Sequence, residues 1–130
     1  MKNLVLILLI SLSSFAFATS SSDCKPLTLE NVELEIINKQ IKHPEIVLRQ
    51  AILETGWLKS YNAKVRKNLF GFWNSKRKQY FVFECWQASV AYYKNWQDRH
   101  YKGGDYYEFL ERIGYATDPD YVWKLKNIKT

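Results

Sequence analysis

A single acidic residue in a mostly apolar stretch is the first candidate for chemistry. Glu54 lies in the sequence QAILETGW (residues 50–57), and helical spacings of four and three place it on one face with Val47 and Ala51. A carboxyl group held against apolar walls binds its proton more tightly than one in water, and a glycosidase needs that property in its general acid. The alternative is a half-buried glutamate that forms a structural ion pair with a nearby lysine or arginine.

The element that must position Glu54 is a helix expected from about Pro44 to Thr55. Proline suits the first helical position, His43 before it is a candidate cap, and Gly56 is suited to end the helix just beyond its last turn. Glu54 is therefore expected on the inward-facing side near the helix end, where a cleft can open.

Two aromatic runs predict a small β-hairpin. The first run is NLFGFW (residues 68–73) and the second is YFVF (residues 80–83), with a polar tip between them. Such a hairpin would form one wall of a cleft. The alternative is a hairpin that packs into the core, a role that Phe70, Val82 and Phe83 suit in either case.

Apolar residues at helical spacing predict further helices at about residues 29–41, 86–98, 106–113 and from 119 onward. Their expected caps are Thr28, Asp105 with Glu108 three residues on, and Asp118 with Pro119 at the first helical position. The polar and basic residues 58–67 indicate a loop or a frayed helical turn. The fold class that follows is mainly α with a small β-hairpin, in a single domain.

The first residues have the three parts of a secretory signal peptide, which we expect to span residues 1–18. Lys2 supplies the positive start, an apolar run follows, and AFA (residues 16–18) is a small-x-small cleavage site. A retained membrane anchor is the weaker alternative, because the apolar run is short and contains three serines. We expect residues 19–28 to be a lead-in and residues 29–130 to be the domain, in a protein exported to a periplasm or the medium without a stable membrane anchor.

The chain is basic, with 19 lysines and arginines against 13 aspartates and glutamates, a formal net charge of +6. A basic, exported, aromatic-rich domain suits an acidic polymer such as a bacterial cell wall, an anionic surface or nucleic acid, and charge alone does not choose among them. Cys24 and Cys85 would enter an oxidising compartment, where one disulfide and two free cysteines are nearly equal alternatives. His43 and His100 are isolated, and no metal-ligand cluster or phosphate-binding loop is evident, so we expect no metal and no cofactor.

Three motifs in order give the chain a resemblance that covers about residues 29–128. QAILETGW (50–57), NLFG (68–71) and GYATDPDY (114–121) resemble the glucosaminidase domain of glycoside hydrolase family 73, which includes the wall-lytic domain of flagellar rod-assembly proteins and many bacterial autolysins. The resemblance implies a lysozyme-like α+β domain that hydrolyses the β-1,4 bond between N-acetylglucosamine and N-acetylmuramic acid. The expected partner is therefore the glycan strand of peptidoglycan, bound by a monomer, and not nucleic acid.

The resemblance also assigns roles to residues. Glu54 matches the family's catalytic glutamate, which protonates the leaving oxygen. Tyr115 matches the tyrosine at the family's catalytic centre, and its hydroxyl would orient a water molecule or the acetamido group of the substrate. The substrate-binding candidates are Trp57, Phe70 and Trp73, as rings that stack on sugars, and Asn68, with core packing as the alternative for Phe70 and shaping of the hairpin turn as the alternative for Asn68.

The sequence departs from the family's pattern at the second carboxylate. Some larger members supply an acid from a longer hairpin, whereas the tip at residues 74–79 contains no Asp or Glu. Glu84 is the nearest acid, but it stands where relatives tend to have a helix-capping serine, and capping is the favoured interpretation. Besides water activation by Glu84, the open routes are attack by the substrate's own N-acetyl group and attack by loosely held water after the leaving group departs. Asp118 and Asp120 are interpreted as caps.

Two other classes of protein remain open. A muramidase or lytic transglycosylase would cut the other glycosidic bond of the same polymer, and a lone glutamate suits a transglycosylase because that reaction needs no water-activating base. A non-catalytic wall-binding module would keep the fold and the cleft without the reaction. Nucleic-acid binding is disfavoured, because no recognition module is evident and export is hard to reconcile with it.

Overall fold

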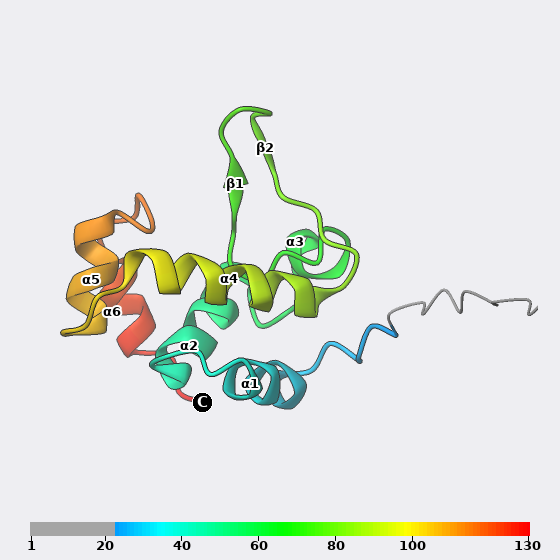
Figure 1. Ribbon diagram of the computed structural model, residues 1–130, viewed down its shortest axis with the longest axis horizontal. Coiled ribbons are helices and arrows are strands. Elements are labelled where there is room, and N and C mark those ends of the chain that lie inside the picture. Colours follow the sequence, from blue (N-terminus) through cyan, green and yellow to red (C-terminus); the bar gives the residue numbers. More distant parts are fainter. Residues whose placement is uncertain (1–22) are drawn as a thin grey trace, which may run out of the picture.

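The computed structural model describes residues 23–130, which form six helices and one two-stranded hairpin (Figure 1). The expected signal peptide at residues 1–18 and the first part of the lead-in lie outside the described residues. In chain order the elements are α1 (Leu29–Asn38), α2 (Pro44–Thr55), α3 (Tyr61–Lys64), β1 (Trp73–Asn74), β2 (Gln79–Tyr80), α4 (Trp86–His100), α5 (Tyr106–Ile113) and α6 (Tyr121–Lys126). The expected fold class, mainly α with a small hairpin, is confirmed.

Helix α2 is the central element of the core. It contacts α1, α3 and α6, and it buries side chains on nearly every side: Ile46, Val47, Leu48, Gln50, Ala51, Ile52 and Thr55. A helix that is apolar almost all round is stable only when other elements cover it. Helix α4 runs along the length of the molecule, and α5 and α6 pack against each other near its C-terminal end (Figure 1). Within residues 23–130, no helix is both long and apolar enough to cross a membrane.

Local sequence signals explain most helix ends. Pro44 stands at the first position of α2, and Gly56 ends that helix in the left-handed conformation with φ +54°. Thr28 caps α1 by accepting a hydrogen bond from the backbone of Asn31 at 3.1 Å. Asp105 caps α5 in the same way, through the Glu108 N–H at 2.9 Å.

Two expected caps make no side-chain hydrogen bond that caps a helix. His43 occupies the N-cap position of α2, but its side chain makes no capping hydrogen bond, because Nε2 lies 2.9 Å from the hydroxyl of Tyr101 instead. Helix α6 begins at Tyr121 rather than after Asp118. Asp118 accepts a hydrogen bond from the Asp120 N–H at 2.9 Å, which closes a turn before the helix instead of capping it.

The hairpin projects from the helical body (Figure 1). Its register is Trp73 opposite Tyr80 and Asn74 opposite Gln79. The fully buried Asn68 holds its base, since its amide donates to the carbonyl oxygens of Phe72 at 2.9 Å and Phe81 at 3.1 Å and accepts from the Phe72 N–H at 3.1 Å. The hairpin is therefore fastened to the core by a side chain, and its two paired strands begin only beyond that point.

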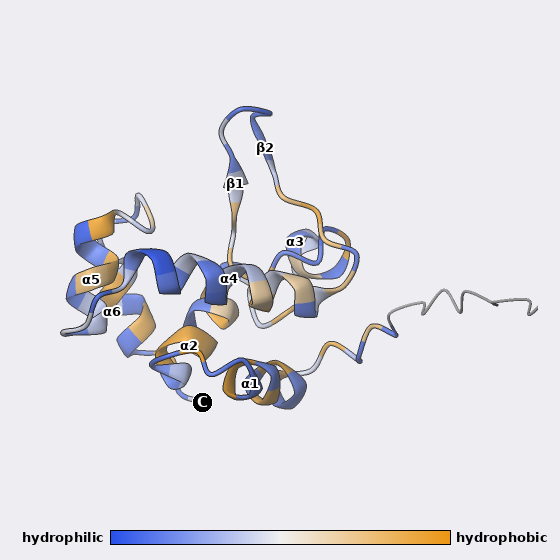
Figure 2. Ribbon diagram, in the orientation of Figure 1, coloured by the Kyte–Doolittle hydropathy of each residue, from blue (hydrophilic) through white to orange (hydrophobic). Residues whose placement is uncertain are grey.

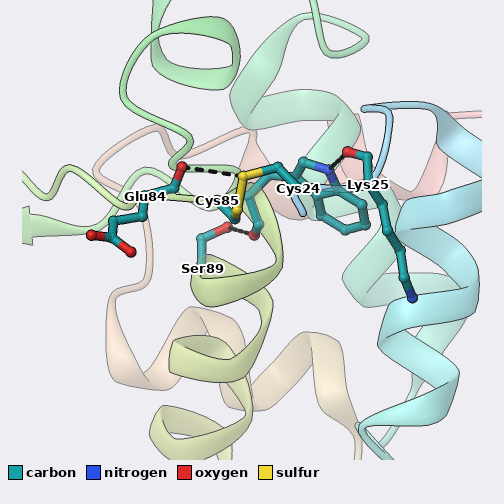
Figure 3. Close-up of a disulfide and its surroundings, with 6 residues drawn as sticks. Cys24, Lys25, Glu84, Cys85 and Ser89 are labelled. Atoms are coloured by element: carbon teal, nitrogen blue, oxygen red, sulfur yellow. Dashed lines mark hydrogen bonds between the residues drawn. A yellow bond between two sulfur atoms is a disulfide. The ribbon is translucent and has the colours of Figure 1, made fainter. Parts of the chain in front are cut away.

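A disulfide joins Cys24 to Cys85, the residue just before α4, with Cα atoms 5.3 Å apart (Figure 3). Beside it the indole Nε1 of Trp86 donates to the carbonyl oxygen of Lys25 at 2.6 Å. Of the two alternatives for the cysteines, the structure has the bonded one. The two contacts fasten the segment before α1 to the helical body.

Replacing both cysteines by serine should lower the free energy of unfolding by about 2–4 kcal/mol, because a crosslink between distant residues restricts the unfolded chain. Urea titration of the native protein and of Cys24→Ser/Cys85→Ser measures the difference. The native protein under reducing conditions is the control and should match the double variant. Equal urea midpoints for the oxidised native protein and the variant would show that the crosslink contributes nothing.

Candidate active site

A cleft of about 450 Å³ opens between the base of the hairpin and the loop that joins α5 to α6. The end of α2 and the middle of α4 complete its lining. The lining residues are Glu54, Phe70, Gly71, Phe72, Trp73, Tyr80, Trp96, Ile113, Gly114, Tyr115, Ala116 and Thr117. Glu54 is the one acidic residue among them. The cleft therefore brings residues of the three sequence motifs to one place.

Glu54 lies in the last turn of α2, with its carboxyl group largely withdrawn from water. Burial raises the pKa of Glu54 above its ordinary value of 4.5, and a hydrogen bond from Tyr121 opposes this by a smaller amount. Within residues 23–130 the ion pairs use the acids Glu35, Asp98 and Asp118, and not Glu54. The alternative of a structural ion pair at Glu54 is therefore wrong.

Gly71 brings the backbone of the hairpin directly against this carboxyl group. Its φ is +69°, and a Cβ atom at this position would lie only 2.8 Å from Oε2 of Glu54. A carbon atom so close to the oxygen is repelled, and a side chain is also strained at positive φ, so glycine meets both demands at once. The glycine of the second motif thus lets the hairpin close over the acid.

Gly71→Ala should displace the carboxyl group of Glu54. If that group is catalytic, the rate of the reaction should fall by about tenfold or more, because displacing a catalytic group by a fraction of an ångström has effects of this order. The matched control is Gly56→Ala, which introduces the same side chain at φ +54° where no atom lies within 4 Å. Initial rates, with unfolding measured in parallel, separate the two. If Gly71→Ala lost no more activity than Gly56→Ala, contact with Glu54 would not be what requires the glycine.

A chain of hydrogen bonds reaches Glu54 from the far side of the core. It starts at the backbone of Lys42, whose N–H donates to Gln97 Oε1 at 2.8 Å and whose carbonyl accepts from Gln97 Nε2 at 2.9 Å. A backbone N–H can only donate and a carbonyl can only accept, so these two bonds fix the orientation of the Gln97 amide. The same Nε2 also donates to the hydroxyl of Tyr106, at 3.0 Å.

The directions of the next bonds follow from the single proton that each hydroxyl carries. The proton of Tyr93 goes to Gln50, so in the 2.6 Å contact between the hydroxyls of Tyr106 and Tyr93 the donor is Tyr106. Tyr93 in turn donates to Gln50 Oε1 at 2.5 Å. The amide nitrogen of Gln50 is then the donor on its other side.

Tyr121 is the last member of the chain before the acid. Its hydroxyl accepts from Gln50 Nε2 at 3.1 Å, which leaves its proton for the carboxyl group of Glu54. Burial and the charge of Glu54 raise the pKa of Tyr121, so the hydroxyl keeps that proton. Apart from the bond from Gln97 Nε2 back to the Lys42 carbonyl, every donor on the path from Lys42 to Glu54 therefore points toward the acid. Bonds aligned in this way polarise one another in the same sense.

Tyr121→Phe should raise the pKa of Glu54 and, if Glu54 is the acid of a reaction, move the alkaline limb of the pH–rate profile to higher pH. A general acid works only when protonated, so activity falls as pH rises through its pKa. The lost hydrogen bond had favoured the charged carboxylate, and its removal raises that pKa further. The control is Tyr101→Phe, which removes another buried hydroxyl, bonded to His43 and to the carbonyl of Gly104. A Tyr121→Phe profile that keeps the native alkaline limb, or shifts it to lower pH, would contradict this role.

Tyr115 closes the side of the cleft that faces the hairpin base. Its hydroxyl donates to the carbonyl oxygen of Phe70 at 2.8 Å, and its ring stacks on Tyr121 with centroids 5.8 Å apart. The hydroxyl is thus held in one orientation, with its lone pairs left to accept a hydrogen bond from a ligand. On the hairpin, Trp73 and Tyr80 meet edge to face at 5.0 Å and are 52% and 37% exposed. Exposed rings beside a cleft offer flat apolar faces on which a ring-shaped ligand can stack.

Three of the sequence-predicted residues do not line the cleft: Trp57, Asn68 and Glu84. Trp57 is exposed beyond the end of α2. Asn68 organises the base of the hairpin through its hydrogen bonds, which agrees with the alternative that it shapes the hairpin turn instead of binding substrate. Glu84 is exposed, and the N-cap of α4 is Cys85, without a side-chain capping bond, so the expected capping role of Glu84 is wrong.

Phe70 lines the cleft but does not offer its ring to a sugar. The residue is only 1% exposed, and its ring packs on Tyr93 with centroids 4.5 Å apart. Core packing, the alternative for this residue, is therefore what the structure has. No group of three side chains able to hold a metal ion occurs in residues 23–130.

Sequence reasoning missed the residues that hold Glu54 in place. Gln50 precedes Glu54 by four residues on the same helix face, a spacing that could have marked it as a partner. Tyr121 ends the third motif, yet only the tertiary fold brings α6 to the end of α2. The exposed Tyr80 was assigned to the hairpin without a role, and it joins Trp73 in the wall of the cleft.

Comparison with known families agrees with this geometry. Residues 32–130 match the family model for glucosaminidase, described as mannosyl-glycoprotein endo-beta-N-acetylglucosaminidase. The chain therefore belongs to this glucosaminidase family, glycoside hydrolase family 73. Neither a curated protein nor a solved structure matches the chain significantly.

Proposed function

We propose that the chain is an exported peptidoglycan hydrolase that cleaves the β-1,4 bond between N-acetylglucosamine and N-acetylmuramic acid, with Glu54 as the general acid. The observation that carries the proposal is a largely desolvated carboxyl group, free of ion pairs, in a cleft with an exposed aromatic wall. Membership of a glycoside hydrolase family supports a glycan substrate. The disulfide supports an oxidising compartment outside the cytoplasm.

In the proposed reaction the protonated Glu54 gives its proton to the leaving glycosidic oxygen while the sugar develops oxocarbenium character. The raised pKa keeps a larger fraction of the carboxyl group protonated near neutral pH than an ordinary glutamate would have. Once the proton has left, the Tyr121 hydroxyl stabilises the carboxylate, because its hydrogen bond favours the charged form. Tyr115, fixed by Phe70, orients the acetamido group of the substrate.

The second reacting group in this proposal is the substrate's own acetamido oxygen, which attacks the anomeric carbon before water completes the hydrolysis. Glu84 and Asp118 are the candidates for a second acid. Glu84 does not line the cleft. Asp118 shares an adjoining depression with Glu54, but it pairs with Lys124 and accepts the Asp120 N–H. Neither supports a second carboxylate that activates water.

Glu54→Gln should abolish turbidity clearing of purified peptidoglycan, by a factor of about 100 or more, because the amide has no proton to donate. Glu84→Gln is the matched control: it makes the same change outside the cleft and should leave clearing near the native rate. Loss of activity in Glu84→Gln would instead support the hypothesis that Glu84 is a second catalytic carboxylate that activates water. Equal clearing by native protein and a folded Glu54→Gln variant would contradict the proposal, and no clearing by either would favour a wall-binding module.

A lytic transglycosylase is the second candidate, favoured by the single acid in the cleft, since that reaction needs no base for water. Mass spectrometry of the released fragments distinguishes the two enzymes. N-acetylglucosamine at the reducing end marks the proposed glucosaminidase. Fragments that end in an anhydro-N-acetylmuramic residue would mark the transglycosylase.

A further inference from the structure

The charge of the chain is concentrated in one segment. Seven of the 19 lysines and arginines lie in residues 55–83, and none of the 13 aspartates and glutamates does. The rest of the chain holds all the acidic residues in near balance with the other basic ones. We call residues 55–83 the basic segment; its cations are Lys59, Lys64, Arg66, Lys67, Lys76, Arg77 and Lys78.

The cations of the basic segment are not used by the fold as ion pairs. In residues 23–130 the ion-paired lysines are Lys25, Lys39, Lys94 and Lys124, all outside the segment. Five of the seven cations are exposed, including the three consecutive ones at the hairpin tip. Figure 2 shows this tip as hydrophilic at the end of a hairpin whose base is apolar. Three of the five exposed cations are therefore presented to solvent on the projecting hairpin, and the other two, Lys59 and Lys64, lie just before α3 and in it.

The basic segment is continuous with the cleft. Tyr80 lines the cleft and also a second hollow of about 370 Å³ on the hairpin, which Arg77 borders. The guanidinium of Arg66 lies over the rings of Tyr61 and Tyr80, at 4.7 and 5.4 Å from their centroids. The ring of Tyr80 thus joins the cleft wall to two cations of the basic segment, Arg66 and Arg77.

We propose that the basic segment binds the carboxylates of peptides attached to the glycan strand that lies in the cleft, so that the preferred substrate is a peptide-bearing strand rather than a bare one. The inference rests on the proposed function. A peptide joined to a strand in the cleft has to leave it past the cleft lining, and on the hairpin side that lining continues through Tyr80 into the hollow that Arg77 borders. A free phosphate polymer would require positive charge but no continuity with the cleft, and that continuity favours the peptides.

The test measures binding and does not depend on turnover. Glu54→Gln protein is added to insoluble peptidoglycan with its peptides intact, to the same material after phosphate polymers have been extracted, and to glycan strands stripped of peptides by an amidase. The lobe variant, named for the projecting hairpin that carries the substituted residues, adds Lys76→Gln, Arg77→Gln and Lys78→Gln. The control adds Arg99→Gln, Lys102→Gln and Lys129→Gln, which remove the same charge from exposed positions outside the segment.

We expect the Glu54→Gln protein and the control to bind peptide-bearing material about tenfold more tightly than stripped strands. This preference should weaken as salt is added. The lobe variant should bind both materials equally. Extraction of phosphate polymers should change nothing. The proposal is overturned by equal binding to both materials, by equal losses in the lobe variant and the control, or by binding that follows phosphate content. In an otherwise native background, the lobe substitutions should leave cleavage of a peptide-free oligosaccharide unchanged. Failure of the proposed function would appear separately, as absence of clearing by native protein.

Discussion

The directional chain of hydrogen bonds that ends at Glu54 is the interaction on which the rest of the structure depends. Its members come from four helices that share the core: Gln50 from α2, Tyr93 and Gln97 from α4, Tyr106 from α5 and Tyr121 from α6. A buried polar group that loses its hydrogen-bond partner lowers the stability of the fold by about 1–3 kcal/mol. Each residue of the hydrogen-bonded series therefore requires the next one. The contacts that orient the acid are thus also the contacts that fix how these helices pack.

The site is a compromise between burial and hydrogen bonding. Desolvation by the cleft walls, with Gly71 pressed against the carboxyl group, favours the protonated form of Glu54, and Tyr121 partly restores the charged form. The folded pKa is raised above the unfolded value, so the folded state binds more protons between the two values. Stability therefore falls as pH rises through that window. At neutral pH the buried carboxyl group therefore makes the folded state less stable. The same environment lets the group donate a proton and then stabilises the resulting carboxylate through Tyr121.

Signals between near neighbours in the sequence predicted most of the fold. Thr28, Gly56 and Asp105 act through backbone groups within four residues, which is why their helix ends were predicted correctly. His43 failed as a cap because a tyrosine 58 residues away takes its side chain. The motifs located the acid and Tyr115, but Tyr121 lies 71 residues from its partner Gln50, and no local pattern reveals that contact. The aromatic run anticipated the core position of Phe70, whereas Val82, expected to pack in the core with it, is 68% exposed.

The most direct measurement is a titration of the Glu54 carboxyl group itself. Carbon-13 NMR of protein labelled at the glutamate side-chain carboxyl, with the Glu54 resonance assigned by its absence in Glu54→Gln, reports that pKa without any substrate. A midpoint clearly above the ordinary value of 4.5 is expected, because burial outweighs the hydrogen bond from Tyr121. A midpoint at or below that value would mean that the cleft does not hold a desolvated acid, and the proposed role of Glu54 would lose its physical basis.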